Sequence, residues 1–237
     1  MALHLPVPRP PESVDAFLLV VVDFSSALAL QQLFARELLS SSRHRGCLLL
    51  CEHPPCVTRG TERLDDQTLA ETGTSLLERS LSVPRPGGLL EHGPTQLAIY
   101  PVFSLARMEL TPLGYRDCLE AVVARACREQ GVPEVTILPG VGVSSRGGLV
   151  ARTAIHVSDE VTQLGMYLNV SVPYSLHTRL RCSSLDVACM KRTDLARLKT
   201  DVVHQFASWL GSTRVAIYTR HPMLRRTGKP RRDEKQA

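Results

Sequence analysis

The chain has 237 residues, of which 43% are hydrophobic and 22% are charged. This balance is typical of an ordinary globular protein and excludes a disordered chain. The longest uncharged apolar run covers residues 16–22, far short of the roughly 18 to 20 residues that cross a bilayer, so a membrane protein is also excluded. The length allows one large domain or two small ones.

The formal net charge of +5 is located in one segment. From Arg220 onward the chain carries seven basic residues and two acidic ones, which leaves residues 1–219 formally neutral. Such a tail is usually solvated, and the alternative is a loose contact with nucleic acid or an acidic protein. We expect residues 220–237 to form a disordered tail, and we do not expect a nucleic-acid-binding fold.

The seven cysteines form an odd set without a CxxC pair. The first 14 residues are rich in proline and lack an apolar segment of the kind found in signal peptides, so we expect a cytoplasmic protein with reduced thiols. Cys51 and Cys56 flank His53, but no second cluster completes a zinc tetrahedron, so we expect no metal.

Hydrophobic periodicity predicts strands and helices in alternation. The apolar runs 17–22, 47–51, 96–102 and 135–138 are typical of strands, and 149–158 and 165–172 are expected to pair across a polar turn at Asp159 and Glu160. Helices are expected over 27–39, capped by Ser25 and Ser26, around 68–71, over 114–130 and over 194–210, with a last strand at 214–219. Strands and helices mixed in this way favour a single α+β domain over residues 15–219, after a proline-rich extension at 1–14.

Three segments differ from plain scaffold. Residues 85–96 and 140–152 are rich in glycine, which lets the backbone approach a ligand closely and exposes N–H groups. Neither contains the GxxxxGK[ST] phosphate loop. The third segment places Cys182 beside Arg181 and ahead of a helix, and both neighbours favour a thiolate. Taken singly, each segment has a structural explanation: a hairpin connection, a turn, an inert loop cysteine.

In combination the three segments resemble one family, the lipoyl/octanoyl transferases of the biotin/lipoate protein ligase superfold. Residues 52–55 (EHPP) match a family motif, and Arg85 and His92 have the separation of seven found in the family's RGGxxTxHGPGQ loop. Residues 165–170 (GMYLNV) resemble the family's xALNV strand end. Cys182 follows Asn169 by thirteen residues, close to the family's spacing for its nucleophile.

The resemblance implies a mixed sheet with packed helices and an acyl transfer through a Cys182 thioester. It implies octanoyl-acyl carrier protein as the donor, and as acceptors the lipoyl domains of 2-oxoacid dehydrogenases or the glycine cleavage H protein, without cofactor or metal. The glycine-rich backbone is expected to line the acyl site and to supply N–H donors to the oxyanion. The substrate-binding residues it implies are Arg85, Pro86, Gly87, Gly88, Leu89, Leu90, Glu91, His92, Arg152, Thr153, Ala154, Gly165, Met166 and Tyr167.

The chain departs from the family at several positions. Ungapped alignment places Leu149 where the family carries a lysine that activates the cysteine and relays protons. Guanidinium groups near Cys182 cannot accept a proton near pH 7, so we consider His92 as a substitute base. Cys189, seven residues after Cys182, is the reserve nucleophile.

Two rival functions follow from the same resemblance. One is a degenerate relative that binds acyl groups or a carrier domain without turnover, because the lysine is missing. The other is a ligase that activates its acid with ATP, for which the lysine would also be needed.

Overall fold

The computed structural model describes residues 6–62, 74–171, 181–211 and 213–224. Its largest feature is an eight-stranded sheet with the order β11-β1-β2-β6-β10-β9-β8-β7. Its strands are β1 (Ser13–Val21), β2 (Arg45–Glu52), β6 (Gln96–Val102), β7 (Thr136–Leu138), β8 (Gly142–Ser145), β9 (Gly148–Ser158), β10 (Val161–Asn169) and β11 (Arg214–Tyr218).

A second sheet has three short strands in the order β4-β3-β5. These are β3 (Cys56–Arg59), β4 (Leu81–Ser82) and β5 (Leu89–His92). The helices are α1 (Phe24–Ser40), α3 (Thr74–Arg79), α4 (Leu105–Met108), α5 (Pro112–Glu129), α6 (Leu185–Cys189) and α7 (Leu195–Leu210).

The large sheet is mixed. β1 runs parallel to both β2 and β11, whereas the neighbours from β2 through β6, β10, β9 and β8 to β7 are antiparallel. A mixed sheet with packed helices is the α+β fold class that the sequence predicts. β1 begins at Ser13, two residues before the expected boundary, and the segment ahead of it already contacts the body, since the Arg9 N–H donates to the Met108 carbonyl.

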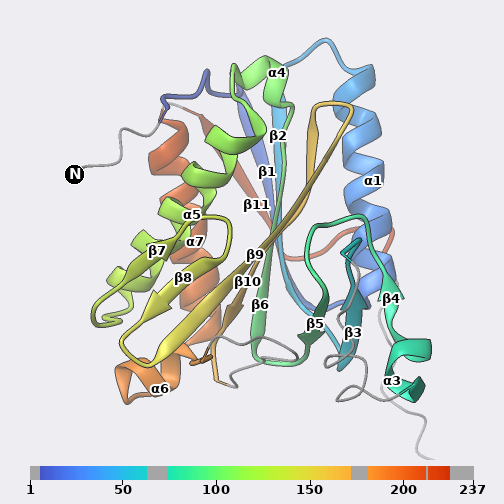
Figure 1. The fold of residues 1–237 in the computed structure, drawn as a ribbon. Helices are drawn as coiled ribbons and strands as arrows, with labels where there is room; N and C mark the ends of the chain where they lie inside the picture. The colour runs from blue at the N-terminus through green and yellow to red at the C-terminus, as the bar shows by residue number, and fades with distance from the viewer. Residues whose placement is uncertain (1–5, 63–73, 172–180, 212, 225–237) are drawn as a thin grey trace, which may run out of the picture.

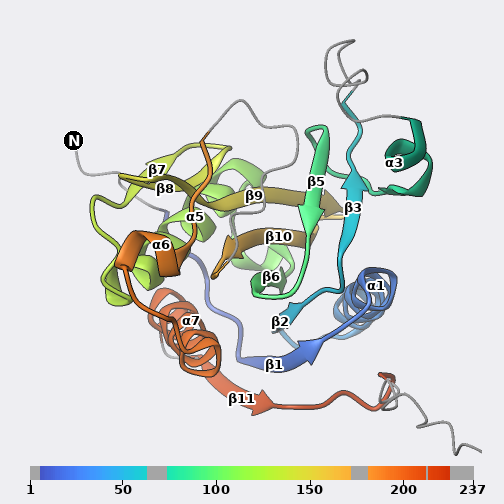
Figure 2. The ribbon, with the colours of Figure 1, turned by 90° about the horizontal axis from the view of Figure 1, so that it is seen from below.

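Helices cover both faces of the large sheet. α5 and α7 pack on one face, and α1 and the small sheet lie on the other (Figures 1 and 2). The predicted helical stripes are confirmed, because Leu119, Val122 and Cys127 of α5 and Val202 and Phe206 of α7 are buried in the same core.

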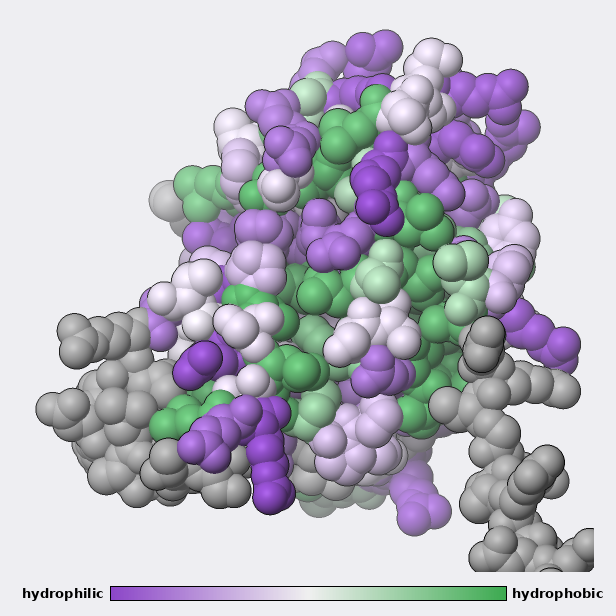
Figure 3. Space-filling model, turned by 90° about the vertical axis from the view of Figure 1, so that its right-hand side faces the viewer, coloured by the Kyte–Doolittle hydropathy of each residue, from purple (hydrophilic) through white to green (hydrophobic). Residues whose placement is uncertain are grey.

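The second core lies between α1 and the opposite sheet face. On that side of the molecule, hydrophilic side chains gather at the upper end and apolar ones in the middle (Figure 3). Gln31 is the polar exception on the buried face of α1: its side-chain oxygen accepts the Leu164 N–H at 2.6 Å. Because Leu164 has a left-handed φ of 56°, its N–H needs a partner outside a regular ladder.

Most predicted elements are confirmed to within a few residues. The expected cap of α1 is wrong, since Asp23 rather than a serine is the N-cap and accepts the Ser26 N–H at 2.9 Å. The turn at Asp159 and Glu160 is confirmed, and both residues have positive φ. The helix expected around 68–71 and most of the basic tail lie outside the described residues.

Three strands of the structure were not among the expected ones: β3, β5 and β8. Each has only four residues, too few for a hydrophobic period to stand out. β5 falls inside the first glycine-rich segment, where it pairs antiparallel with β3 through Cys56↔His92 to Arg59↔Leu89.

The strand ends converge at one edge of the large sheet, at the bottom of Figure 1. β2 ends at Glu52, and β6 begins at Gln96, which pairs with Asn169 at the end of β10. Leu149 is the second residue of β9. We refer to this end, defined by Glu52, Gln96, Leu149 and Asn169, as the lower edge.

Candidate active site

Cys182 lies at the lower edge, in a short segment that runs beside the start of β9. It forms an isolated parallel β-bridge with Leu149. The Leu149 N–H donates to the Arg181 carbonyl and the Ser183 N–H donates to the Leu149 carbonyl, both at 2.8 Å. Cys182 is half-buried between exposed Arg181 and buried Ser183. The backbone on both sides of the thiol is therefore fixed to the sheet.

Two glycines make this approach possible. Gly148 has a φ of +124°, and a Cβ on it would collide with the Arg181 carbonyl oxygen. A Cβ on Gly147 would lie 3.0 Å from the Ser183 hydroxyl. The glycine-rich sequence of the second segment thus serves the close contact between β9 and the cysteine segment.

The predicted substrate-binding residues 152–154 of β9 and 165–167 of β10 lie side by side. Gly165 pairs with Ala154, Met166 with Thr153, and Tyr167 with Arg152. Because directly paired residues share a face, the side chains of Arg152, Ala154 and Tyr167 lie on the α1 side. Thr153 points the other way and donates to Glu120 of α5 at 2.8 Å, and Met166 belongs to the α5/α7 core.

The expected oxyanion donors on β10 are wrong for Met166 and Tyr167. Both residues pair with β9 on one side and with β6 on the other. In a central antiparallel strand the N–H groups are used by the ladders, so neither residue has one to offer. β5 is an edge strand of the small sheet, and alternate backbone groups of Leu89–His92 point away from its one partner.

His92 lies against the same face of the large sheet. Its ring centroid is 4.4 Å from that of Tyr167 and 5.1 Å from that of Phe24. Its Nε2 lies 2.9 Å from the Thr58 hydroxyl and its Nδ1 lies 3.1 Å from Gln96 Oε1. Burial lowers the pKa of His92 well below 6.5. Burial thus disfavours the protonated ring, and both ring nitrogens are engaged, so these contacts do not favour a direct proton transfer from Cys182 to His92.

Arg85 is buried and turns inward. Its guanidinium donates to the carbonyls of Pro86 and Gly88, both at 2.9 Å, and to the carbonyl and hydroxyl of Thr58, both at 3.1 Å. Burial lowers its pKa, and the nearby charge of Arg152 acts in the same direction. These bonds hold the 85–88 turn against β3, and a Cβ on Gly60 would collide with the carbonyls of Arg85 and Gly87.

The remaining predicted residues surround this turn. Pro86 is exposed, Gly87, Gly88, Leu90 and Glu91 are half-buried, and Leu89 is buried. The turn and β5 thus bring Leu90 against the core that contains Tyr167.

The comparisons with known proteins agree on one family. A model described as the lipoyl protein ligase A/B catalytic domain matches residues 23–194. The chain belongs to this family.

Several curated relatives are named octanoyltransferases. A mitochondrial octanoyl-[acyl-carrier-protein]:protein N-octanoyltransferase of Xenopus tropicalis is 34% identical over 63% of this chain and 64% of its own length. Octanoyltransferases of Koribacter versatilis and Solibacter usitatus are 32% and 34% identical, over 63% and 65% of this chain. The match covers 62% of the Koribacter protein and 70% of the Solibacter protein, so the chain spans less than two thirds of the first two relatives.

Solved structures share the fold at low identity. A lipoate-protein ligase A bound with ATP superposes with a TM-score of 0.64 at 13% identity, over 90% of each chain. A bipartite lipoate protein ligase of Thermoplasma acidophilum gives 0.63 at 12% identity, over 88% of each chain. These values confirm the predicted fold.

Position 149 differs from the residue that the resemblance implies. The resemblance places a lysine there, and the structure brings that position directly beside Cys182. Here it holds a leucine that is 4% exposed. The two positions that the resemblance relates to each other are therefore direct neighbours, and the side chain at position 149 is apolar.

A buried lysine from another element reaches the lower edge. Lys199 of α7 donates to the Leu19 carbonyl at 2.7 Å and lies 3.4 Å from Glu52 Oε1. The other carboxylate oxygen of Glu52 accepts the Thr95 N–H at 3.1 Å. The first residue of the EHPP motif thus fixes the loop ahead of β6, a role that periodicity did not reveal.

His53 of the same motif is structural. Its Nδ1 donates to the Val22 carbonyl at 2.7 Å, and its Nε2 lies 2.6 Å from the Tyr100 hydroxyl. Tyr100 in turn lies 3.3 Å from the Tyr167 hydroxyl. Within the described part of the chain, no group of three or more His, Cys, Asp and Glu side chains is arranged to hold a metal ion.

Cys189, the reserve nucleophile, is the last residue of α6. Its thiol donates to the Gln130 carbonyl at 3.6 Å, and burial raises its pKa. This position next to α5 favours a structural role. None of the helices formed by the described residues combines the length and apolar character needed to cross a bilayer.

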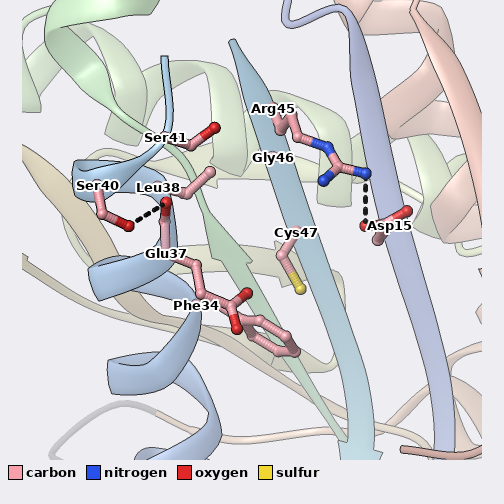
Figure 4. A pocket seen from close by; sticks show the side chains of 9 residues that line it. All are labelled: Asp15, Phe34, Glu37, Leu38, Ser40, Ser41, Arg45, Gly46 and Cys47. Carbon is pink, nitrogen blue, oxygen red and sulfur yellow. Dashed lines mark hydrogen bonds and ion pairs between the residues drawn. The ribbon is translucent and has the colours of Figure 1, made fainter. Parts of the chain in front are cut away.

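A pocket of about 300 Å³ lies at the other end of β2, beside the end of α1 (Figure 4). It holds an ion pair of Arg45 with Asp15 at 3.8 Å. Its lining residues are Asp15, Phe34, Glu37, Leu38, Ser40, Ser41, Arg45, Gly46 and Cys47. None of them is a predicted site residue, so this pocket is separate from the candidate active site.

Proposed function

We propose that this chain is an octanoyltransferase of lipoate biosynthesis. It moves an octanoyl group from a thioester on acyl carrier protein to a lysine of a lipoyl domain. The observation that carries the proposal is the β-bridge between Cys182 and Leu149, which sets the cysteine beside the strand position where the family has its activating group. The relatives named octanoyltransferases support the same reaction.

The transfer proceeds in two steps that balance without a cofactor. The Cys182 thiolate attacks the octanoyl carbonyl, the new C–S bond forms, and the bond to the carrier sulfur breaks; the proton lost by Cys182 ends on the carrier thiol. The lysine amine then attacks the acyl-enzyme, the amide forms, and a proton from nitrogen returns to the cysteine sulfur. Position 149 holds a leucine, so no lysine at that position relays these protons.

The acyl chain would lie against the α1 side of the large sheet. Tyr167, Ala154 and the stem of Arg152 form that face, with His92 above it. Leu90 of β5, in the small sheet, packs against the same core and supplies further apolar surface. Arg85 and Pro86 to Gly88 shape the turn beside it, and Glu91, Gly165, Thr153 and Met166 act through their backbone or through packing.

Partners and compartment follow as proposals from the same reaction. Octanoyl-acyl carrier protein is the donor, and the lipoyl domains of 2-oxoacid dehydrogenases or the glycine cleavage H protein are the acceptors. A cytoplasmic location remains a prediction from the sequence.

Intact-protein mass spectrometry after mixing with octanoyl-acyl carrier protein tests the proposal. We expect one octanoyl adduct that forms in the unmodified protein and in Cys189→Ala and is lost in Cys182→Ala. Cys189→Ala is the matched control, because it removes a second half-buried thiol seven residues away.

Two results would overturn the proposal. No adduct on the unmodified protein, under conditions where the carrier still binds, would indicate a degenerate binding relative. Modification of a lipoyl domain that requires ATP and free octanoate would indicate a ligase.

A further inference from the structure

A chain of buried side chains connects the first glycine-rich segment to the residue that follows Cys182. His92 Nδ1 lies 3.1 Å from Gln96 Oε1, and Gln96 Nε2 donates to Asn169 Oδ1 at 3.0 Å. Asn169 Nδ2 then donates to the Ser183 carbonyl at 3.1 Å. The chain begins with Arg85, whose Nη2 donates to the Thr58 hydroxyl beside His92 Nε2.

All hydrogen bonds in this series are donated in the same direction, from Arg85 toward the Ser183 carbonyl. The Ser183 carbonyl can only accept, so the amide nitrogen of Asn169 faces it and its oxygen faces Gln96. Gln96 must then present its oxygen to His92, which makes Nδ1 the protonated nitrogen. The neutral ring accepts the Thr58 hydroxyl proton at Nε2, in agreement with the low pKa of His92. A single arrangement of protons therefore satisfies every hydrogen bond in the series from Arg85 to Ser183.

Burial makes this arrangement obligatory. Arg85, Thr58, His92, Gln96, Asn169 and Ser183 are each at most 5% exposed. Water cannot replace a lost partner at such positions, and a buried polar group without one is costly. A substitution at one of these residues therefore leaves the next one without a hydrogen-bond partner.

The last hydrogen bond of the series, from Asn169 to the Ser183 carbonyl, holds the cysteine segment. Two backbone bonds to Leu149 hold residues 181–183 along β9, and the Asn169 amide holds the Ser183 carbonyl from β10. These three bonds come from two adjacent strands, so they fix both the position and the rotation of the peptide that follows Cys182.

We propose that Asn169 and Gln96 are positioning residues for the Cys182 thiol. Asn169 orients the cysteine segment through the Ser183 carbonyl, and Gln96 orients Asn169 while tying it to His92 over the acyl face. The proposal rests on the function proposed above, in which Cys182 is the nucleophile, and it adds two residues that act on the cysteine segment through the Ser183 carbonyl.

The test compares Asn169→Asp with Gln96→Met in the full chain. Aspartate still accepts from Gln96, but its carboxylate cannot donate to Ser183. Methionine keeps about the size of Gln96 and breaks its links to both His92 and Asn169. Gln31→Leu is the matched control, because it removes another buried side-chain amide that bonds to β10, at Leu164. The readouts are the alkylation rate of Cys182 by iodoacetamide, followed by peptide mass spectrometry, and the single-turnover rate of octanoyl loading.

We expect Asn169→Asp to slow both rates by about tenfold to a hundredfold, since a misplaced reacting group has an effect of that order. The KM for the carrier should stay unchanged. Lowering the pH should shrink the deficit relative to the unmodified protein, because a protonated carboxyl can donate to Ser183 again. Gln96→Met should show a smaller loss without this pH rescue, and Gln31→Leu should lower stability but not the rate of Cys182 alkylation.

Alkylation and loading within twofold of the unmodified protein in both variants would overturn the proposal. An equal loss in Gln31→Leu would do the same, because the effect would then be general destabilisation. If octanoyl loading fails in the unmodified protein while alkylation still responds to Asn169→Asp, the proposed function fails and the positioning role stands. Should Asn169→Asp not fold, the loss of alkylation rate in Gln96→Met decides the matter.

Discussion

Leu149 of β9 and Cys182 of the adjacent segment 181–183 form a β-bridge at the lower edge, with the leucine buried and the cysteine half-buried. The Leu149 N–H and carbonyl bond to the residues on either side of the cysteine. A longer charged side chain at position 149 would therefore start from a backbone fixed next to the thiol.

Leu149→Lys is expected to raise the alkylation rate of Cys182 at pH 7 by about tenfold. An ammonium group near the thiol favours the thiolate, and one pKa unit changes the thiolate fraction about tenfold. Iodoacetamide kinetics between pH 6 and 8 measure the effect. Leu149→Met, which adds length without charge, should leave the rate unchanged; a folded Leu149→Lys protein with an unaltered rate would contradict the prediction.

Gly148→Ala is expected to lower the free energy of unfolding by more than about 1 kcal/mol and to slow Cys182 alkylation. Its φ of +124° disfavours any side chain, and the added Cβ would push away the Arg181 carbonyl. Gly211→Ala is the matched control, because it also has a positive φ of +72° but nothing within 4 Å. Urea unfolding and alkylation rates would separate the two: only Gly148→Ala should affect the thiol.

Glu52→Gln is expected to lower the free energy of unfolding by about 3 kcal/mol, since it leaves the Lys199 ammonium buried without its carboxylate. The side chains of Lys199 and Glu52 are 8% and 13% exposed, so water compensates little. The double variant Glu52→Gln/Lys199→Met should recover most of the loss in urea unfolding. A double variant as unstable as Glu52→Gln would show that the ion pair is not the cause.

Stability is expected to fall as the pH drops below about 6.5. Burial lowers the pKa values of His53 and His92, so the unfolded chain binds protons there before the folded protein does. Each such histidine contributes a slope of up to about 1.4 kcal/mol per pH unit between 6.5 and its folded pKa. Urea unfolding from pH 7.5 to 5.5 checks this, and His92→Gln should reduce the slope. Equal slopes in the two proteins would contradict the assignment to His92.

The long elements were predictable from local patterns. The helices α5 and α7 and the strands β6, β9 and β10 have enough residues for their apolar periodicity to stand out, and their buried stripes follow from that periodicity. The family was also indicated by the sequence, because order and spacing need no tertiary structure. The positions that indicated it are residues 52–55, Arg85, His92, Asn169 and Cys182.

The contacts among those residues were decided by the tertiary structure. Lys199 reaches Glu52 across 147 positions, and Gln96 reaches Asn169 across 73, so no local pattern records either bond. The inward turn of Arg85 and the neutral, fully engaged ring of His92 depend on burial between two sheets, which desolvates the groups and selects their partners. Residue types along the chain thus determine which groups are available, whereas burial and strand register determine which of them meet and which protonation state each one holds.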